Sequence, residues 1–249
     1  MNRPTIYEQQ ALRELKAWKK QINRKPSLLG YASKSVQNKL NDLLPPKVHH
    51  AITVVIKQMV RGVLFGATYM VPKIIQKQSL QQQEVLAIKR INRYKHTAAA
   101  EGGLTGAGGF FTSMADFPLL LGIKLKMLFD IAAAYGYDVK DYKERVYILH
   151  IFQLAFSSRQ HSQNVLEQMT NWEEKKHQLP EDINQFDWTH FQQEYRDYID
   201  LAKMAQLIPG IGAVVGYIVN YRLIVKLGKT AMNAYRLRWA EQLGVSSQF

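Results

Sequence analysis

The sequence predicts an all-α protein that folds as one domain over residues 1–249. Apolar residues recur three and four positions apart through most of the chain, which is the spacing of helices with one buried face. No segment alternates apolar and polar residues for long enough to indicate a strand. We therefore expect a multi-helix bundle in which glycine-rich turns lead into long apolar helices. Residues 1–30 would form an amphipathic basic helix and residues 31–243 the core.

The first predicted helix begins at a capping box and ends before Pro26. Thr5 and Glu8 have the spacing at which each side chain bonds the other's backbone N–H. Basic residues flank an apolar face that carries a tryptophan, a pattern typical of a helix in a membrane interface. A helix packed on the core with its charges in water would show the same pattern, and both interpretations stay open. The residues that would contact a membrane surface are Arg13, Lys16, Trp18, Lys19, Lys20, Arg24 and Lys25.

Further helices follow along the chain, separated by proline, glycine and polar segments. Pro45 ends one of them, and Gly136 is suited to cap another. The polar residues 167–187 are expected to form a surface excursion, and Asp187 to cap a helix that follows it. The helices are predicted at residues 31–44, 47–70, 83–97, 112–135, 142–156 and 212–243.

The positive charge is concentrated in the first part of the chain. The net charge is +13, and residues 1–100 hold 18 Lys and Arg against 4 Asp and Glu. Such a surface suits nucleic acid, an anionic membrane or an acidic partner, although a solvated basic surface has the same composition. Nucleic acid ranks last, because no nucleic-acid-binding motif accompanies the charge.

The glycine cluster before the 112–135 helix is the most informative stretch. Glycine costs about 1 kcal/mol in a helix relative to alanine, so several together predict a tight turn or a close backbone approach. Asp116 follows in apolar surroundings, where a carboxylate must be paired, hydrogen-bonded or protonated. We expect a structural role, with a catalytic one as the alternative. A second segment aligns with this one, so that Gly108 matches Gly212 and Asp116 matches Asn220; two related glycine-turn-helix units are a hypothesis.

Glycine spacing and one uncharged run raise the question of membrane insertion. Gly62/Gly66, Gly102/Gly106 and Gly212/Gly216 are four residues apart, which favours close helix packing in water as in lipid. Residues 204–221 carry no charge, but a run of 18 residues is at the lower limit of the length that a helix needs to span a membrane. A buried turn or a shallow membrane hairpin is the preferred interpretation.

The usual catalytic and cofactor motifs are missing. Neither glycine cluster satisfies the dinucleotide or P-loop pattern, and no GxSxG motif is present. The chain has no cysteine, and its seven histidines show no metal-ligand spacing. We therefore expect no metal, no cofactor and no catalytic residue that the sequence could identify. The first residues lack the apolar stretch of a signal peptide, which favours a cytoplasmic location.

The two glycine-rich segments and the helices that follow them read EGGLTGAGGFFTSMADFPLLLGIKLKMLFDIAAAYGYD and IPGIGAVVGYIVNYRLIVKLGKTAMNAYRLRW. Both segments resemble the signature of the EcsC family. The family is named after a bacterial gene beside the two components of an ABC exporter, so the resemblance implies a bacterial, mostly helical protein with a membrane or transporter connection. It implies no reaction. The signature positions carried over are Gly102, Gly103, Gly106, Gly109, Asp116, Pro209, Gly210, Gly212 and Asn220.

These observations predict a non-enzymatic accessory protein. It would act peripherally at the inner face of the cell membrane, with an anionic membrane surface and an ABC transporter as partners. The alternative is a soluble enzyme or a helical protein that binds a lipid or small molecule in a pocket near Asp116. The sequence leaves the oligomeric state open.

Overall fold

The structure is a computed structural model that describes residues 3–24, 54, 57, 60–63, 72–74, 78–107, 109–157, 159–187, 189, 191 and 213–245. Residues 98–107, 109–120, 159–160, 213–217 and 219 are described by their backbone alone. The regular elements in these ranges are helices, and no strand occurs among them. The all-α prediction is confirmed.

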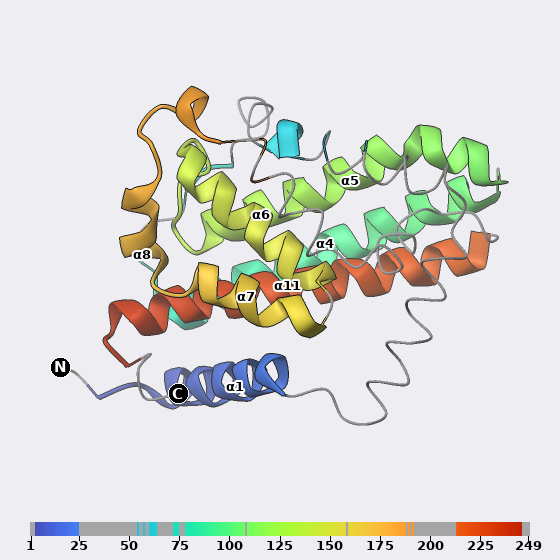
Figure 1. The fold of residues 1–249 in the computed structure, drawn as a ribbon. Coiled ribbons are helices and arrows are strands. Elements are labelled where there is room, and N and C mark those ends of the chain that lie inside the picture. Colours follow the sequence, from blue (N-terminus) through green and yellow to red (C-terminus); the bar gives the residue numbers. More distant parts are fainter. Residues whose placement is uncertain are drawn as a thin grey trace.

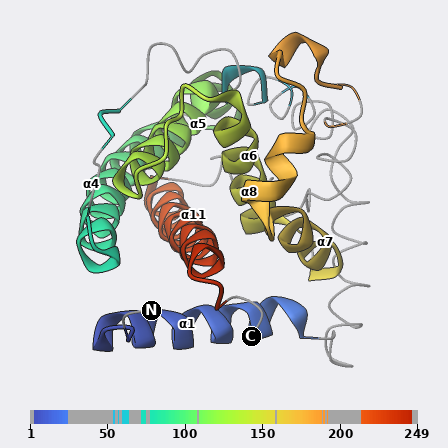
Figure 2. The ribbon, with the colours of Figure 1, turned by 90° about the vertical axis from the view of Figure 1, so that its left-hand side faces the viewer.

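The long helices α4, α5 and α11 run side by side along the molecule (Figure 1). α4 and α5 form a helical hairpin, and α11 lies along α4 in the most extensive helix contact. α6 packs against α11 and α7, while α1 crosses beneath α11 (Figure 2). The helices are α1 (Ile6–Asn23), α4 (Leu80–Ala107), α5 (Gly109–Ala134), α6 (Tyr142–Phe156), α7 (Arg159–Met169), α8 (Trp172–Lys175) and α11 (Ala213–Gln242), with 3-10 turns η2 (Lys176–Gln178) and η3 (Ile183–Gln185).

Helix α6 has the bounds predicted from the sequence and lies inside the core. Fourteen of its fifteen residues are buried, as expected for a helix that is apolar on most of its circumference. Asp141 caps it, because its carboxylate accepts a hydrogen bond from the Lys143 N–H at 2.9 Å. α6 therefore anchors the surrounding helices to one core.

Two predicted helix ends are also confirmed. Thr5 and Glu8 form the reciprocal capping box at the start of α1. Gly136 ends α5 with φ of 88°, in the left-handed region that glycine occupies without strain. The N–H of Tyr137 donates to the Ala132 carbonyl at 3.0 Å, which closes the helix end.

The start of α4 lies earlier than predicted. The helix was predicted to begin at residue 83, but α4 begins at Leu80. Ser79 and Gln82 cap it reciprocally: the Gln82 side chain accepts from the Ser79 N–H at 3.1 Å, and the Ser79 hydroxyl accepts from the Gln82 N–H at 3.4 Å. The Ser-x-x-Gln spacing is a capping-box pattern, so this helix start could have been predicted from the sequence.

The end of α4 corrects the extent of the predicted glycine turn, because the two helices of the hairpin are separated only between Ala107 and Gly109. The helix was expected to end near Thr97 but continues to Ala107, so Gly102, Gly103 and Gly106 have helical backbone. α4 packs along α5 and α11, and such tertiary contacts outweigh the helix cost of glycine.

The predicted surface excursion at 167–187 is partly wrong. α7 continues to Met169, and the segment then forms α8 and two 3-10 turns. Trp172 is buried against the core, because burial of its large apolar ring outweighs the polar character of its neighbours.

Three expectations lie mainly outside the described residues. They are the helix at 31–44, most of the helix at 47–70, and the helix after Asp187. Residues 60–63 are helical, as predicted. α5 and α11 each begin one residue after the two glycines aligned in the repeat hypothesis, Gly108 and Gly212, and the hypothesis stays a prediction.

Candidate functional site

α11 carries two buried arginines, Arg236 and Arg238, that point to opposite sides of the helix. Residues two positions apart are separated by about 200° around a helix. Each guanidinium is matched by carboxylates from other helices, so the two residues tie different parts of the chain to α11.

Arg236 joins α1 and α4 to α11. Its Nε and Nη2 donate to the two carboxylate oxygens of Glu84 at 2.6 and 2.7 Å, and its Nη1 donates to Glu14 at 2.6 Å. The Tyr7 hydroxyl donates to Glu84 at 2.6 Å. Burial and this bond raise the pKa of Tyr7 to about 12, so Tyr7 remains a neutral donor.

Arg238 joins α6 and α8 to α11, and its side chain is fully buried. Its Nη1 and Nη2 donate to Glu144 at 2.6 and 2.7 Å, and its Nε donates to Glu173 at 3.0 Å. The guanidinium lies 3.6 Å from the ring centroid of Tyr137 and 4.7 Å from that of Tyr147. Burial alone would lower the pKa of Arg238, but the bonds to Glu144 raise it above the usual arginine value.

Each cluster pairs one guanidinium with one buried carboxylate, from Glu84 or Glu144, and one partly exposed carboxylate, from Glu14 or Glu173. Because each cluster joins three helices, we assign both a structural role. In the described ranges, no three His, Asp or Glu side chains converge as a metal site.

A buried amine links the two signature segments. The Nζ of Lys124 on α5 donates to the Asn220 side chain on α11 at 3.0 Å, and both residues are buried. Burial lowers the pKa of Lys124 to about 7. The Asp116 side chain, for which the sequence predicts a partner, is outside the described residues. Asn220 is thus a signature residue with a defined contact.

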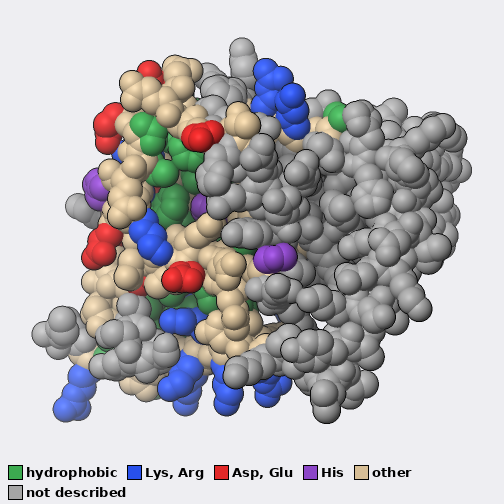
Figure 3. Space-filling model, in the orientation of Figure 1, with side chains coloured by type: hydrophobic (Ala, Val, Ile, Leu, Met, Phe, Trp, Pro, Cys, Tyr) green, Lys and Arg blue, Asp and Glu red, His purple; other side chains and the backbone are tan. Residues whose placement is uncertain are grey.

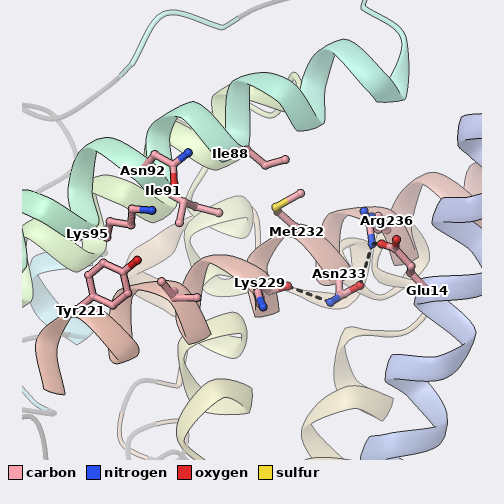
Figure 4. A pocket seen from close by; sticks show the side chains of 11 residues that line it. Glu14, Ile88, Ile91, Asn92, Lys95, Tyr221, Lys229, Met232, Asn233 and Arg236 are labelled. Carbon is pink, nitrogen blue, oxygen red and sulfur yellow. Dashed lines mark hydrogen bonds and ion pairs between the residues drawn. The ribbon is translucent and has the colours of Figure 1, made fainter. Parts of the chain in front are cut away.

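A groove of about 570 Å³ lies between α4 and α11, with α1 at one end (Figure 4). Ile88 and Ile91 of α4 line it, as do Val225 and Met232 of α11. Lys95 and Tyr221 lie at one end, and the Glu14–Arg236 ion pair lies at the other. Lys229 lies between these ends, so one part of a largely apolar groove is cationic.

The helices that form the groove approach each other closely at Gly228. A Cβ at this position would lie 2.5 Å from Cγ1 of Ile91, so the contact requires glycine. A Cβ added to Gly62, which belongs to one of the predicted packing pairs, would meet no described atom within 4 Å. Gly228 is outside the three pairs that the sequence singled out, and of those pairs only Gly62 has surroundings that the structure describes.

The predicted membrane-contact residues divide between two sides of α1. Arg13, Lys16, Lys20 and Arg24 are exposed and form what we call the basic face. Lys and Arg side chains line the lower edge of the molecule in Figure 3, where α1 lies in Figure 1. Trp18 is half-buried and packs against the core, and Lys19 is also half-buried. Lys25 lies outside the described residues.

The basic face is opposite the side of α1 that packs on the core. With about 100° between successive residues, the four cations fall within a sector of about 80°. Ala11 and Leu15 are buried on the other side. Ile6 lies in the sector of the cations and is 84% exposed.

The remaining signature residues are placed only in part. Gly109 begins α5, and Asp116 lies in the same helix. Pro209, Gly210 and Gly212 are outside the described residues, so a pocket near Asp116 stays a prediction. In the described part of the chain, no helix is both long and apolar enough to cross a membrane.

Comparison with known proteins decides the family. The pattern of the EcsC protein family matches residues 9–240. Protein EcsC of Bacillus subtilis (strain 168) is 45% identical over 228 residues, which cover 91% of this chain and 94% of that protein. The chain belongs to the EcsC family. The uncharacterized protein YdbA of the same strain is 34% identical over 143 residues, or 57% of this chain and 53% of that protein. No solved structure matches this EcsC family member.

Sequence reasoning missed the ion clusters of α11. The two arginines of the Tyr-Arg-Leu-Arg-Trp run stand among large apolar and aromatic residues, and this was a signal that buried acids would face them. The partner acids could not be read from the sequence, since Glu84 is 152 residues from Arg236.

Proposed function

We propose that this EcsC family protein is a non-enzymatic accessory protein that docks at the inner face of the cytoplasmic membrane through α1. The observation that carries the proposal is the basic face of α1, which points away from the core. A membrane is a planar anionic surface, and a row of cations on one side of a surface helix complements it.

The packing of α1 predicts how it would dock. Its apolar face, including Leu15 and Trp18, is in contact with the core, so the helix would adsorb by charge without inserting that face. Each Lys or Arg near an anionic surface contributes about 1 kcal/mol, so the basic face contributes about 4 kcal/mol. Ile6, at the exposed N-terminal end of the same face, would add shallow apolar contact. Such binding is reversible and falls as salt rises.

The proposed partner of the docked protein is an ABC exporter. This part of the proposal rests on the gene neighbourhood from which the family takes its name. An exporter is fixed in the membrane, and weak adsorption of this protein through α1 would raise its local concentration beside such a partner.

Flotation with liposomes tests the docking. Wild-type protein should float with anionic vesicles at low salt, and not with neutral vesicles or at high salt. The variant Arg13→Gln/Lys20→Gln/Arg24→Gln should remain at the bottom of the gradient. A matched variant that removes three exposed cations elsewhere should float like wild type; it is Lys73→Gln/Lys140→Gln/Arg222→Gln.

Two outcomes would contradict the proposal. Equal loss of flotation in both variants would show that only net charge matters. Flotation that survives high salt would instead indicate insertion, for which residues 204–221 are the candidate.

A further inference from the structure

The groove between α4 and α11 leaves apolar surface open to solvent. Ile88 lines it and is 44% exposed, and it lies beside the buried Ile91 and Met232. Apolar walls hold water poorly, so an apolar ligand gains free energy by displacing that water. The volume of about 570 Å³ is in the range of small-molecule sites.

The charge along the groove is uneven. At one end, Arg236 faces two carboxylates, Glu14 and Glu84, so this end has no excess of positive charge. Lys95 stands at the other end and Lys229 between the two ends, and the described residues provide no carboxylate within salt-bridge distance of either lysine. The groove thus has an apolar part and a cationic part, and it complements a molecule with an apolar tail and an anionic head.

The shape of the groove favours an extended acyl chain over a peptide helix as its ligand. Because α4 and α11 touch at Gly228 and Ile91, the space between them narrows to a seam. A helix is about 10–12 Å wide with its side chains and would lie on top of the seam, whereas an extended acyl chain can enter it. From Tyr221 to Arg236 the groove follows α11 for about 22 Å at 1.5 Å per residue. One leaflet of a bilayer core is about 15 Å thick, so a lipid acyl chain fits with room for its head group.

We propose that this groove binds a single acyl chain that ends in an anionic head group, as a fatty acid or a lysolipid does. The head group lies between Lys95 and Lys229, and the chain covers Ile88 and Met232 toward the Glu14–Arg236 pair. The inference does not depend on membrane docking through α1, since the groove and the basic face share no residue.

Calorimetric titration of the full chain below the micelle concentration tests the ligand class. Dodecanoate and dodecyl phosphate should both bind, while dodecyltrimethylammonium, which has the same chain and a cationic head, should bind at least tenfold more weakly. Equal binding of anion and cation would overturn the proposal. So would failure of dodecanoate to bind while an acidic amphipathic helical peptide binds, because the groove would then be a protein-docking site.

Two pairs of variants locate the binding. Ile88→Gln should weaken dodecanoate binding about tenfold, whereas Val85→Gln should not, although Val85 is equally exposed on α4 at 45%. Lys229→Gln should weaken it about fivefold, and Lys89→Gln, an exposed lysine outside the groove, should leave it unchanged. Equal effects within each pair would place the ligand elsewhere.

One variant separates this inference from the docking proposal. Arg13→Gln/Lys20→Gln/Arg24→Gln should bind dodecanoate as wild type does, whatever its behaviour with liposomes. Loss of dodecanoate binding in this variant would show that the ligand sits on α1 and not in the groove.

Discussion

Replacing Arg238 with methionine should lower the free energy of unfolding by about 3–5 kcal/mol. The Arg238 side chain is fully buried and Glu144 is almost as buried, with 5% of its side chain exposed. Methionine keeps much of the arginine stem but removes the guanidinium, so the Glu144 carboxylate is left in the core without its partner. Since domains are stable by only about 5–15 kcal/mol, this is a large fraction of the total.

Urea unfolding followed by far-UV circular dichroism measures the change. The melting temperature should fall by about 6–20 °C for a chain of this size. Arg222→Met removes an exposed arginine from the same helix and should change stability by less than about 0.5 kcal/mol. A second substitution should partly rescue the loss: Arg238→Met/Glu144→Gln should be more stable than Arg238→Met alone, because the amide needs no counter-charge. Two results would refute a buried ion pair that stabilises the fold. One is an Arg238→Met variant within 1 kcal/mol of wild type. The other is a double variant whose loss equals the sum of the losses in Arg238→Met and Glu144→Gln.

Three further changes test the packing, the buried amine and the cap of α4. Gly228→Ala should cost about 1–3 kcal/mol because its Cβ would overlap Ile91, and Gly228→Ala/Ile91→Ala should be less destabilised than the two single effects combined. Burial lowers the pKa of Lys124 from 10.5 to about 7, so between these pH values the unfolded chain binds a proton that the folded chain lacks. The free energy of unfolding of the wild type should therefore rise with pH from 7 to about 9. Lys124→Met should stabilise the protein at pH 7 and reduce this dependence on pH. Ser79→Ala removes the hydroxyl that caps α4 and should cost about 1 kcal/mol in urea unfolding; an unchanged midpoint would contradict the capping role.

The sequence predicted those elements whose signals are local. The capping box at Thr5, the span of α6 and the glycine cap at Gly136 each depend on residues within one or two turns, and all three are confirmed. The Ser79–Gln82 box was an equally local signal that went unread. Helix α7 was missed because its polar residues lack the apolar repeat that marks α6.

The pairing of side chains that are distant in the sequence could not be predicted. Nothing near Arg236 indicates Glu84, and nothing near Lys124 indicates Asn220, because these contacts arise only when α4, α5 and α11 pack. The groove has the same origin: its walls come from helices more than 100 residues apart. The helical backbone of Gly102, Gly103 and Gly106 was not predicted, because intrinsic propensity is a weak guide when a helix is packed along two others.

The orientation of α1 on a bilayer is the most direct test of the docking account. The chain has no cysteine, so a single cysteine carries a unique fluorophore. Ala17→Cys places it on the exposed side of α1 beside the basic face, and Lys140→Cys places it in the exposed connection between α5 and α6. With anionic vesicles that carry a quencher in the head-group region, we expect quenching of the Ala17→Cys label, reversed by salt, and little at Lys140→Cys. Equal quenching at both positions, or none at Ala17→Cys while the protein floats with the vesicles, would contradict docking through α1.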